Sequence, residues 1–370
     1  MKNTTASTIS FALLAFLVIL ISGCGKPGSK GKKESTDQKS GTMFKVVDLP
    51  DEKKVEVWID GDLFTSYIYP DQLAKPVLYP LITASGKVLT RGIPLDPIAG
   101  ERVDHPHQIG VWMNYGDVNG LDFWNNSEAI PEEDKYRFGT ITHKEVRNIQ
   151  GRDDLGMLEV VNEWKTPDGI VLLEEQTRFI FSVQGNSRII DRITTLQALN
   201  QAVSFKDNKE GMFAVRVARA LELPSDKPAI FLDAQGVPAE TEVLDNTGVN
   251  GNYLSSEGID GEGVWGTRAR WMKLHSTIDG EKVAIVIFDH PDNVGYPTYW
   301  HARAYGLFAA NPLGQSIFTN GEQVLDFKLA ANESVSFKFR LLVHSGKALR
   351  KQTIDTFADQ FAELQTLAFH

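Results

Sequence analysis

Two short segments of the 370-residue chain repeat an Asp-His-Pro triplet and together hold four of its eight histidines. The first, at residues 103–112, reads VDHPHQIGVW, and the second, at residues 288–303, reads FDHPDNVGYPTYWHAR. His105 and His107 are two residues apart, so in an extended strand both imidazoles would project from one face. Pro106 lacks a ladder donor, which places such a strand at a sheet edge or rim. The pair predicts two nitrogen ligands for one divalent metal ion, although two histidines near a turn more often form ordinary hydrogen bonds.

The second segment adds two histidines and an arginine. His290 also precedes a proline and ends an apolar strand, so we predict that it, or His301 in its place, completes the metal site with His105 and His107. His301 and Arg303 again have the i, i+2 spacing and would project from one face. We expect catalytic roles for both, with His301 moving a proton and Arg303 stabilising a developing oxyanion.

Aromatic and acidic side chains near these histidines have the composition of a sugar-binding pocket. Tyr299 and Trp300 directly precede the predicted catalytic histidine, and such rings stack on the apolar face of a pyranose. Packing in the core is an equally good interpretation of both rings. The stretch GDVNGLDFWNN contains Asp122 and Trp124 and is rich in Gly and Asn, as binding loops are. Together with Trp112, these residues form the predicted substrate-binding set.

A third segment, DNKEGMFAVRVAR at residues 207–219, places charged side chains at a turn and on the strand after it. Glu210 is the carboxylate that we predict as a general base or a metal ligand, although a solvated turn acid is the commoner role for such a residue. We assign Lys209 to substrate binding. Arg216 lies on an otherwise apolar strand, where a buried guanidinium needs a partner, and we predict that it stabilises an oxyanion.

Several classes of protein are excluded by missing motifs and by charge. The chain has no Walker-type phosphate loop, no Gly-x-Ser-x-Gly elbow and no dinucleotide fingerprint, so we expect no nucleotide cofactor. Its net charge is −10, and setting aside Lys2 and the lysine-rich residues 24–43, which together carry +4, leaves −14 for the rest. A domain this acidic lacks the basic stripes that nucleic-acid binding requires.

The N-terminus predicts a bacterial lipoprotein precursor. The apolar run at residues 9–21 is shorter than the ~20 residues of a spanning helix and is typical of a signal peptide. The run ends in Ile-Ser-Gly-Cys, which resembles a lipobox, so we expect a signal peptide over residues 1–23 and a lipid on Cys24. A short uncleaved anchor is the alternative. Residues 24–43 are rich in Lys, Gly and Ser and are predicted to be a flexible tether. We therefore expect a protein of the cell envelope, held at the outer membrane by its lipid, and, because Cys24 is the only cysteine, without a disulfide.

Residues 44–370 are predicted to form a single β-rich domain. Five stretches alternate apolar and polar residues with the period of a strand: 53–69, 158–183, 187–199, 282–290 and 333–345. The first two turn at Asp-Gly pairs, as hairpins do. Strands at this spacing predict a large antiparallel β-sandwich. Near the C-terminus apolar residues recur at helical spacing, at Ile354, Phe357, Phe361 and Leu364. We expect this helix to pack against the sandwich.

Three segments together resemble a bacterial family of unknown function that is labelled "methane oxygenase PmoA-like": DHPHQIGVWMNYGDVNGLDFW, KEGMFAVRVAR and DHPDNVGYPTYWHARAYGLFAANPLG. The resemblance covers essentially the whole folded part. It implies an exported protein that accompanies sugar oxidoreductases and 3-keto-sugar enzymes, with a fold similar to the supersandwich of aldose epimerases and polysaccharide lyases. Gln108 departs from the family pattern, in which a histidine or arginine is common there, and this leaves the number of metal ligands open. We expect no methane oxygenation, because the subunit behind the label has many spanning helices and this domain has no apolar stretch of that length.

These observations predict an exported, lipid-anchored, carbohydrate-active enzyme for glycosides or 3-keto-glycosides, with lyase, hydrolase or epimerase chemistry. One divalent metal ion would act as a Lewis acid. Without it, acid–base chemistry of the mutarotase type can use the same residues. The alternative is a non-catalytic carbohydrate-binding lipoprotein of the envelope. The expected partners are a carbohydrate ligand and, through the lipid anchor alone, a membrane; no oligomeric state is assigned.

Overall fold

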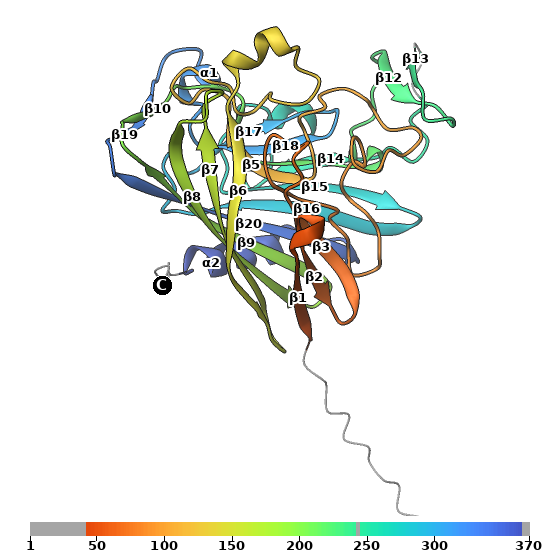
Figure 1. The fold of residues 1–370 in the computed structure, drawn as a ribbon. Helices are drawn as coiled ribbons and strands as arrows, with labels where there is room; N and C mark the ends of the chain where they lie inside the picture. Colours follow the sequence, from red (N-terminus) through yellow and green to blue (C-terminus); the bar gives the residue numbers. More distant parts are fainter. Residues whose placement is uncertain (1–41, 242–244, 365–370) are drawn as a thin grey trace, which may run out of the picture. The chain divides into compact units, whose positions relative to one another are not determined.

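Two eight-stranded antiparallel sheets make up most of the protein, as Figure 1 shows. The structure is a computed structural model and describes residues 42–241 and 245–364. The first sheet has the spatial order β1 (Phe44–Leu49), β2 (Lys54–Ile59), β3 (Asp62–Ile68), β4 (Val77–Leu78), β5 (Val111–Tyr115), β11 (Gly211–Arg216), β18 (Leu307–Asn311) and β17 (Tyr299–Ala302). The second has the order β14 (Asn252–Ser255), β15 (Trp271–Ile278), β16 (Glu281–Asp289), β20 (Ser334–Gly346), β9 (Ser187–Ala198), β8 (Val171–Gln184), β7 (Gly156–Lys165) and β6 (Thr140–Gly151).

Smaller elements lie in the connections between these strands. Two short antiparallel pairs are formed by β10 (Val203–Phe205) with β19 (Phe327–Leu329) and by β12 (Ala229–Leu232) with β13 (Pro238–Thr241). Short 3₁₀ or α-helices of three to six residues are η1 (Pro50–Glu52), η2 (Glu132–Arg137), η3 (Arg219–Leu221), η4 (Gly261–Val264) and α1 (Gln315–Phe318). The longest described helix is α2 (Lys351–Ala362). No helix in the described ranges is both long and apolar enough to cross a membrane.

The inner faces of the two sheets share one hydrophobic core. In β2 the buried residues Val55, Val57 and Ile59 alternate with half-buried neighbours, and they belong to the same cluster as Leu341 and Val343 of β20 in the other sheet. Because side chains of a strand alternate between its faces, each apolar-alternating strand fills this core with every second residue. The structure therefore confirms the predicted large antiparallel β-sandwich.

The predicted hairpins and C-terminal helix are also confirmed. Strands β2 and β3 are joined at Asp60 and Gly61, which both have positive φ, as a tight hairpin turn requires. Helix α2 buries the apolar face predicted from its spacing against the outer face of the second sheet, where Phe357 packs in a cluster with Val286 and Phe288. This outer face is thus closed by a helix.

One local prediction is wrong. The segment around His105 and His107 is not an extended strand but a turn, in which Gln108 N donates to His105 O (3.0 Å) and His105 has φ of +47°. A histidine in the left-handed region is uncommon, and the turn is held by groups described below. The predicted signal peptide at 1–23 and Cys24 lie outside the described residues.

Candidate active site

The outer face of the first sheet carries a row of side chains that spans four strands. Pairing places Trp112 of β5 beside Ala214 of β11, Ala214 beside Ala309 of β18, and Ala309 beside His301 of β17. The two small alanines leave room above the sheet, and Trp124, from the loop after β5, occupies it. Its ring centroid lies 5.3 Å from that of Trp112 and 6.4 Å from that of His301, nearly parallel to the imidazole. The buried indole of Trp124 therefore packs against the imidazole of His301 on the outer face of the sheet.

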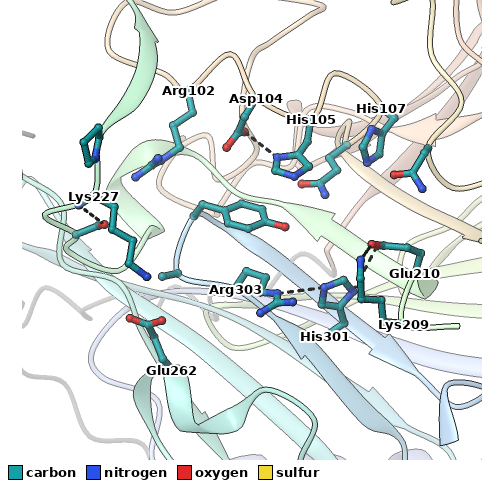
Figure 2. Close-up of a pocket in the computed structure, with 16 residues that line it drawn as sticks. Arg102, Asp104, His105, His107, Lys209, Glu210, Lys227, Glu262, His301 and Arg303 are labelled. Atoms are coloured by element: carbon teal, nitrogen blue, oxygen red, sulfur yellow. Dashed lines mark hydrogen bonds and ion pairs between the residues drawn. The ribbon is translucent and has the colours of Figure 1, made fainter. Parts of the chain in front are cut away.

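A cavity of about 520 Å³ opens over this face, within the size range of small-molecule sites. Figure 2 shows Asp104, His105 and His107 on one wall and Glu210, His301 and Arg303 on the facing wall. The first wall is the turn that contains Asp104, His105 and His107. The second wall is formed by the end of β17 and by the loop before β11. Six predicted site residues thus line one cavity: His105, His107, Lys209, Glu210, His301 and Arg303.

Two buried arginines hold the turn that forms the first wall. Arg91 is 1% exposed, and its guanidinium donates to the carbonyl oxygens of residues 102, 104, 105 and 108 at 2.6–3.2 Å. Arg216, on β11, is fully buried and donates to Gln108 Oε1 (2.6 Å) and to Asp104 Oδ1. Burial lowers the pKa of Arg91 to about 9, and the nearby Arg216 charge adds to this effect. The backbone of the turn is therefore fixed by hydrogen bonds from the buried guanidinium of Arg91.

Asp104 connects these arginines to His105. Burial raises the pKa of the Asp104 carboxyl, but the hydrogen bond from His105 and the charges of Arg216 and Arg91 outweigh burial and hold that pKa well below its usual value. Asp104 Oδ1 lies 3.3 Å from His105 Nδ1, and the imidazole stacks on Tyr305 with ring centroids 4.7 Å apart. A carboxylate beside Nδ1 favours a proton on that nitrogen and leaves Nε2 as an acceptor. The carboxylate thus faces Nδ1 of a ring that is held by stacking on Tyr305.

His301 is neutral and has a defined tautomer. It is 2% exposed, and burial lowers its pKa to about 3, with further lowering by the charges of Arg303 and Lys209. Arg303 Nε donates to His301 Nε2 (3.3 Å), so the ring proton resides on Nδ1. Nδ1 lies 3.6 Å from Glu210 Oε2, while the other carboxylate oxygen of Glu210 pairs with Lys209 Nζ. Nδ1 of the neutral imidazole therefore faces the carboxylate of Glu210 without a hydrogen bond to it.

His107 is the third imidazole at the cavity. Burial lowers its pKa to about 2, and the charge of Lys75 lowers it further. Lys75 is itself buried, with its pKa lowered by burial to about 7, and its Nζ donates to His107 O (2.6 Å). His107 Nε2 is buried and has no partner among the described residues. A neutral ring with one unsatisfied nitrogen is suited to a hydrogen bond with a ligand.

Several predicted substrate contacts are corrected by burial. Trp112, Trp124 and Trp300 are 0% exposed and Tyr299 is 6% exposed, so all four pack inside the protein and do not line the cavity. Trp300 points into the sandwich core and donates from Nε1 to Ala269 O (3.1 Å). Asp122 accepts hydrogen bonds from the backbone of residues 124 and 125, and thereby shapes its own loop. These residues support the site without touching a ligand.

Two predicted roles are also corrected by position. His290 follows β16 and is 2% exposed; its ring lies against Phe361 of α2 (5.1 Å), and it does not line the cavity. The second Asp-His-Pro triplet therefore does not reach the cavity, whereas His301 and Arg303, at the end of the same segment, line it with His105 and His107. Arg216 does not line the cavity either, because it is fully buried, with its two terminal nitrogens donating to Gln108 and Asp104. It positions the turn and is not placed to stabilise an oxyanion.

The predicted metal site does not fit the geometry. With His290 at the far helix, His105 and His107 remain on one wall, and His301, the predicted alternative to His290, lies on the facing wall. Their ring centroids are 5.7 Å apart at 80°. Within residues 42–241 and 245–364, no group of three or more His, Cys, Asp and Glu side chains is arranged to hold a metal ion. We therefore derive no step through a metal.

Important residues of the cavity were not predicted. Asp104 belongs to the Asp-His-Pro triplet, and its place beside a histidine was an available signal. Tyr305 lies in the same aromatic segment as His301, and Gln108 directly follows the histidine pair. Arg91 carries no local signal, because its role depends on a turn more than ten residues away in the chain.

A family comparison covers most of the folded part. Residues 54–359 match the model of a family described as "Family of unknown function (DUF6807)". The chain belongs to this family. No curated protein matches the chain in sequence.

Solved structures with related folds include several carbohydrate enzymes. A GH36 α-galactosidase from Geobacillus stearothermophilus is 10% identical, with 82% of this chain and 40% of that chain covered and a TM-score of 0.36. A putative aldose 1-epimerase from Escherichia coli K12 is 13% identical over 82% and 99% of the two chains, with a TM-score of 0.28. A galactose mutarotase-like protein from Clostridium acetobutylicum is 10% identical over 82% and 99%, with a TM-score of 0.33. The chain thus spans less than half the length of the α-galactosidase, and at these scores the likeness does not extend to an activity.

Proposed function

We propose that the protein is a carbohydrate-active enzyme that moves protons on a glycoside or 3-keto-glycoside bound in this cavity, as a lyase, epimerase or hydrolase does. The observation that carries the proposal is that two carboxylate–imidazole pairs, each with its members in close contact, lie on facing walls of the cavity. Asp104 with His105 forms one pair, and His301 with Glu210 forms the other. Groups on opposite sides of a bound ring can remove a proton at one face and deliver one at the other.

Each residue has a defined part in this proposal. Glu210 accepts a proton from the substrate, since its carboxylate lines the cavity, pairs with Lys209 and faces the neutral His301. His105, oriented by Asp104, exchanges a proton from the opposite wall through Nε2. Arg303 is held by His301 and supplies positive charge to the bound ligand. His107 offers its free Nε2 to a hydroxyl.

Export and lipid attachment at Cys24 belong to the same proposal. They rest on the apolar run at residues 9–21 and the small residues before the cysteine. An enzyme held in the cell envelope would meet glycosides before they enter the cytoplasm.

The proposal is tested by turnover with a matched pair of variants. The purified protein is incubated with a panel of glycosides and their 3-keto derivatives in D₂O, and products and deuterium incorporation are followed by NMR. We expect Glu210→Gln to lose at least about a hundredfold in turnover, the usual scale of a general base, while binding persists in calorimetry. Glu163→Gln is the control, because Glu163 also pairs with lysines but lies outside the cavity.

Two outcomes would contradict the enzyme. Binding of sugars by the wild type without any turnover would indicate a carbohydrate-binding protein instead. Equal turnover by wild type and Glu210→Gln would remove Glu210 from the mechanism and, with it, the pairing on which the proposal depends.

A further inference from the structure

One end of the cavity concentrates positive charge. Arg102, Lys227 and Arg303 line this end, and Figure 2 shows them around the same space, away from His107 and Glu210. The carboxylate of Glu262 lines it as well and forms no ion pair within the described ranges. Three cations facing one carboxylate leave the end positive, while residues 44–370 as a whole carry −14. A local concentration of cations in an acidic domain focuses its field on whatever enters there.

Arg303 is the best placed of these cations to bind an anion. Its Nε donates to His301 Nε2, and its guanidinium lies over the ring of Trp265 at 4.8 Å. These two contacts fix the plane of the guanidinium. Its two terminal nitrogens donate to no acceptor in the part of the chain that the structure describes. A fixed planar fork with free donors matches the geometry of a carboxylate, which it can bind with two parallel hydrogen bonds.

The neighbouring cations are not neutralised in full. Arg102 Nε donates to Glu222 Oε2 (2.7 Å), but Glu222 also accepts from Arg219 (2.6 Å), so one carboxylate serves two guanidinium groups. Lys227 Nζ has no acidic partner among residues 42–241 and 245–364. The rim of the cavity therefore retains positive charge beside the Arg303 fork.

We infer that the ligand of this cavity is an acidic sugar, in which a carboxylate binds Arg303 and the ring extends toward His105 and Glu210. This inference rests on the proposed function and adds the substrate class to it. A carboxylate at this end explains why an uncompensated arginine is held rigid beside acid–base groups. A neutral sugar would leave the cationic end solvated and would make no charge-assisted hydrogen bond there.

The test compares sugars that differ only in their charge. Binding of methyl glucoside and methyl glucuronide, and of methyl galactoside and methyl galacturonide, is measured by calorimetry at one ionic strength, with glucose 6-sulfate as a further probe. We expect the uronide of at least one pair to bind about tenfold more tightly than its neutral partner, the scale of a charge-assisted hydrogen bond. Arg303→Gln should remove this preference, and Lys227→Gln should reduce it.

The control variant is Arg137→Gln, which removes an arginine that is largely exposed on η2 and lies outside the cavity. It should keep the wild-type preference. Equal or tighter binding of the neutral partners would overturn the inference and leave the proposed function intact. The same holds for a preference for the sulfate over both uronides, or for a preference that Arg303→Gln does not change. Absence of binding by every member of both pairs would overturn the proposed function together with the inference.

Discussion

Asp104 is the residue on which the first wall of the cavity depends. Its carboxylate lies between two buried arginines and His105, and the arginine charges keep it ionised. A buried cation that loses its partner is strongly destabilising, because its desolvation is no longer offset. The same carboxylate also selects the tautomer of His105, so stability and chemistry are coupled at this one side chain.

We predict that Asp104→Asn lowers the free energy of unfolding by about 2 kcal/mol, less than the full loss of a buried pair because asparagine keeps one acceptor oxygen. Urea denaturation measures this. The matched control is Asp134→Asn, which breaks the exposed pair with Arg137 and should cost less than about 0.5 kcal/mol. Equal costs for the two variants would show that Asp104 is not the counter-charge of Arg216 and Arg91.

His301 makes stability depend on pH in a defined direction. Its pKa in the folded protein is lowered to about 3, whereas an unfolded histidine titrates near 6.5. Below pH 6.5 only the unfolded state takes up this proton, so the contribution is complete above that pH and is lost as pH falls. From pH 7.5 to pH 5, one such histidine costs about 2 kcal/mol.

We predict that His301→Gln loses less stability than the wild type on acidification over this range, whatever its stability at neutral pH. Denaturant unfolding at pH 7.5 and pH 5 measures the slope for both proteins. His344→Gln is the control, because His344 is partly exposed and should leave the wild-type slope unchanged. Identical slopes for wild type and His301→Gln would mean that His301 is not buried as a neutral ring.

At the scale of elements, strands β11 and β18 contribute space as well as side chains. Ala214 and Ala309 are fully buried in the cross-strand row, and Trp124 packs over them between Trp112 and His301. A larger residue at either alanine competes with the indole for the same volume. Because His301 rests on that indole, packing on the outer face is coupled to the catalytic wall.

We predict that Ala309→Val destabilises the protein by about 2 kcal/mol through overpacking and weakens ligand binding by displacing Trp124. Thermal unfolding measures the loss of stability, calorimetry measures ligand binding, and near-UV circular dichroism measures the displacement of Trp124. The control Ala362→Val makes the same change at an exposed position of α2 and should cost less than about 1 kcal/mol. A wild-type near-UV spectrum for Ala309→Val would contradict the packing described for Trp124.

The strands and the helix could be predicted from local patterns in the sequence. Which of the site residues point into the cavity could be predicted only in part. Alternation and Asp-Gly turns indicated the hairpins, and the spacing of Ile354, Phe357 and Phe361 indicated α2. The i, i+2 spacing of His301 and Arg303 correctly placed both at one cavity. These signals are local in the sequence, and packing did not override them.

His290 shows how a local motif can mislead. The second Asp-His-Pro triplet matched the first one in sequence. The side of the sheet to which a residue at the end of a strand points, however, is set by the alternation of the residues before it. Phe288 lies two residues earlier and packs against α2, so His290 continues on that side and meets Phe361. The role of Trp112 was out of reach for another reason. It lies on the outer face of the first sheet, and that face is buried because the loop after β5 folds back and packs Trp124 over it.

At the scale of the whole molecule, the net negative charge belongs to residues 44–370 and the predicted lipid anchor to the N-terminal segment. Residues 44–370 carry −14, so an acidic sugar is repelled at long range and attracted only at the Arg303 end of the cavity. This distribution of charge favours ligands whose negative group contacts the cations of the cavity directly. The net acidity indicated the absence of nucleic-acid binding, but composition alone does not reveal a positive pocket, because that pocket is assembled from Arg102, Lys227 and Arg303, which are far apart in sequence.

The remaining prediction concerns Cys24, the single cysteine of the chain. Each buried methylene of an acyl chain contributes about 0.8 kcal/mol to membrane binding, so a diacylated cysteine would hold the protein on a membrane without any spanning helix. In a bacterial host fed labelled palmitate, the wild type should take up label and sediment with membranes, and Cys24→Ser should do neither. Ser29→Ala, five residues on in the predicted tether, should behave as the wild type. Sugar binding should be equal in all three, because every cavity residue lies between positions 102 and 305. A wild type that takes up no label would refute the lipoprotein assignment and leave the chemistry of the cavity untouched.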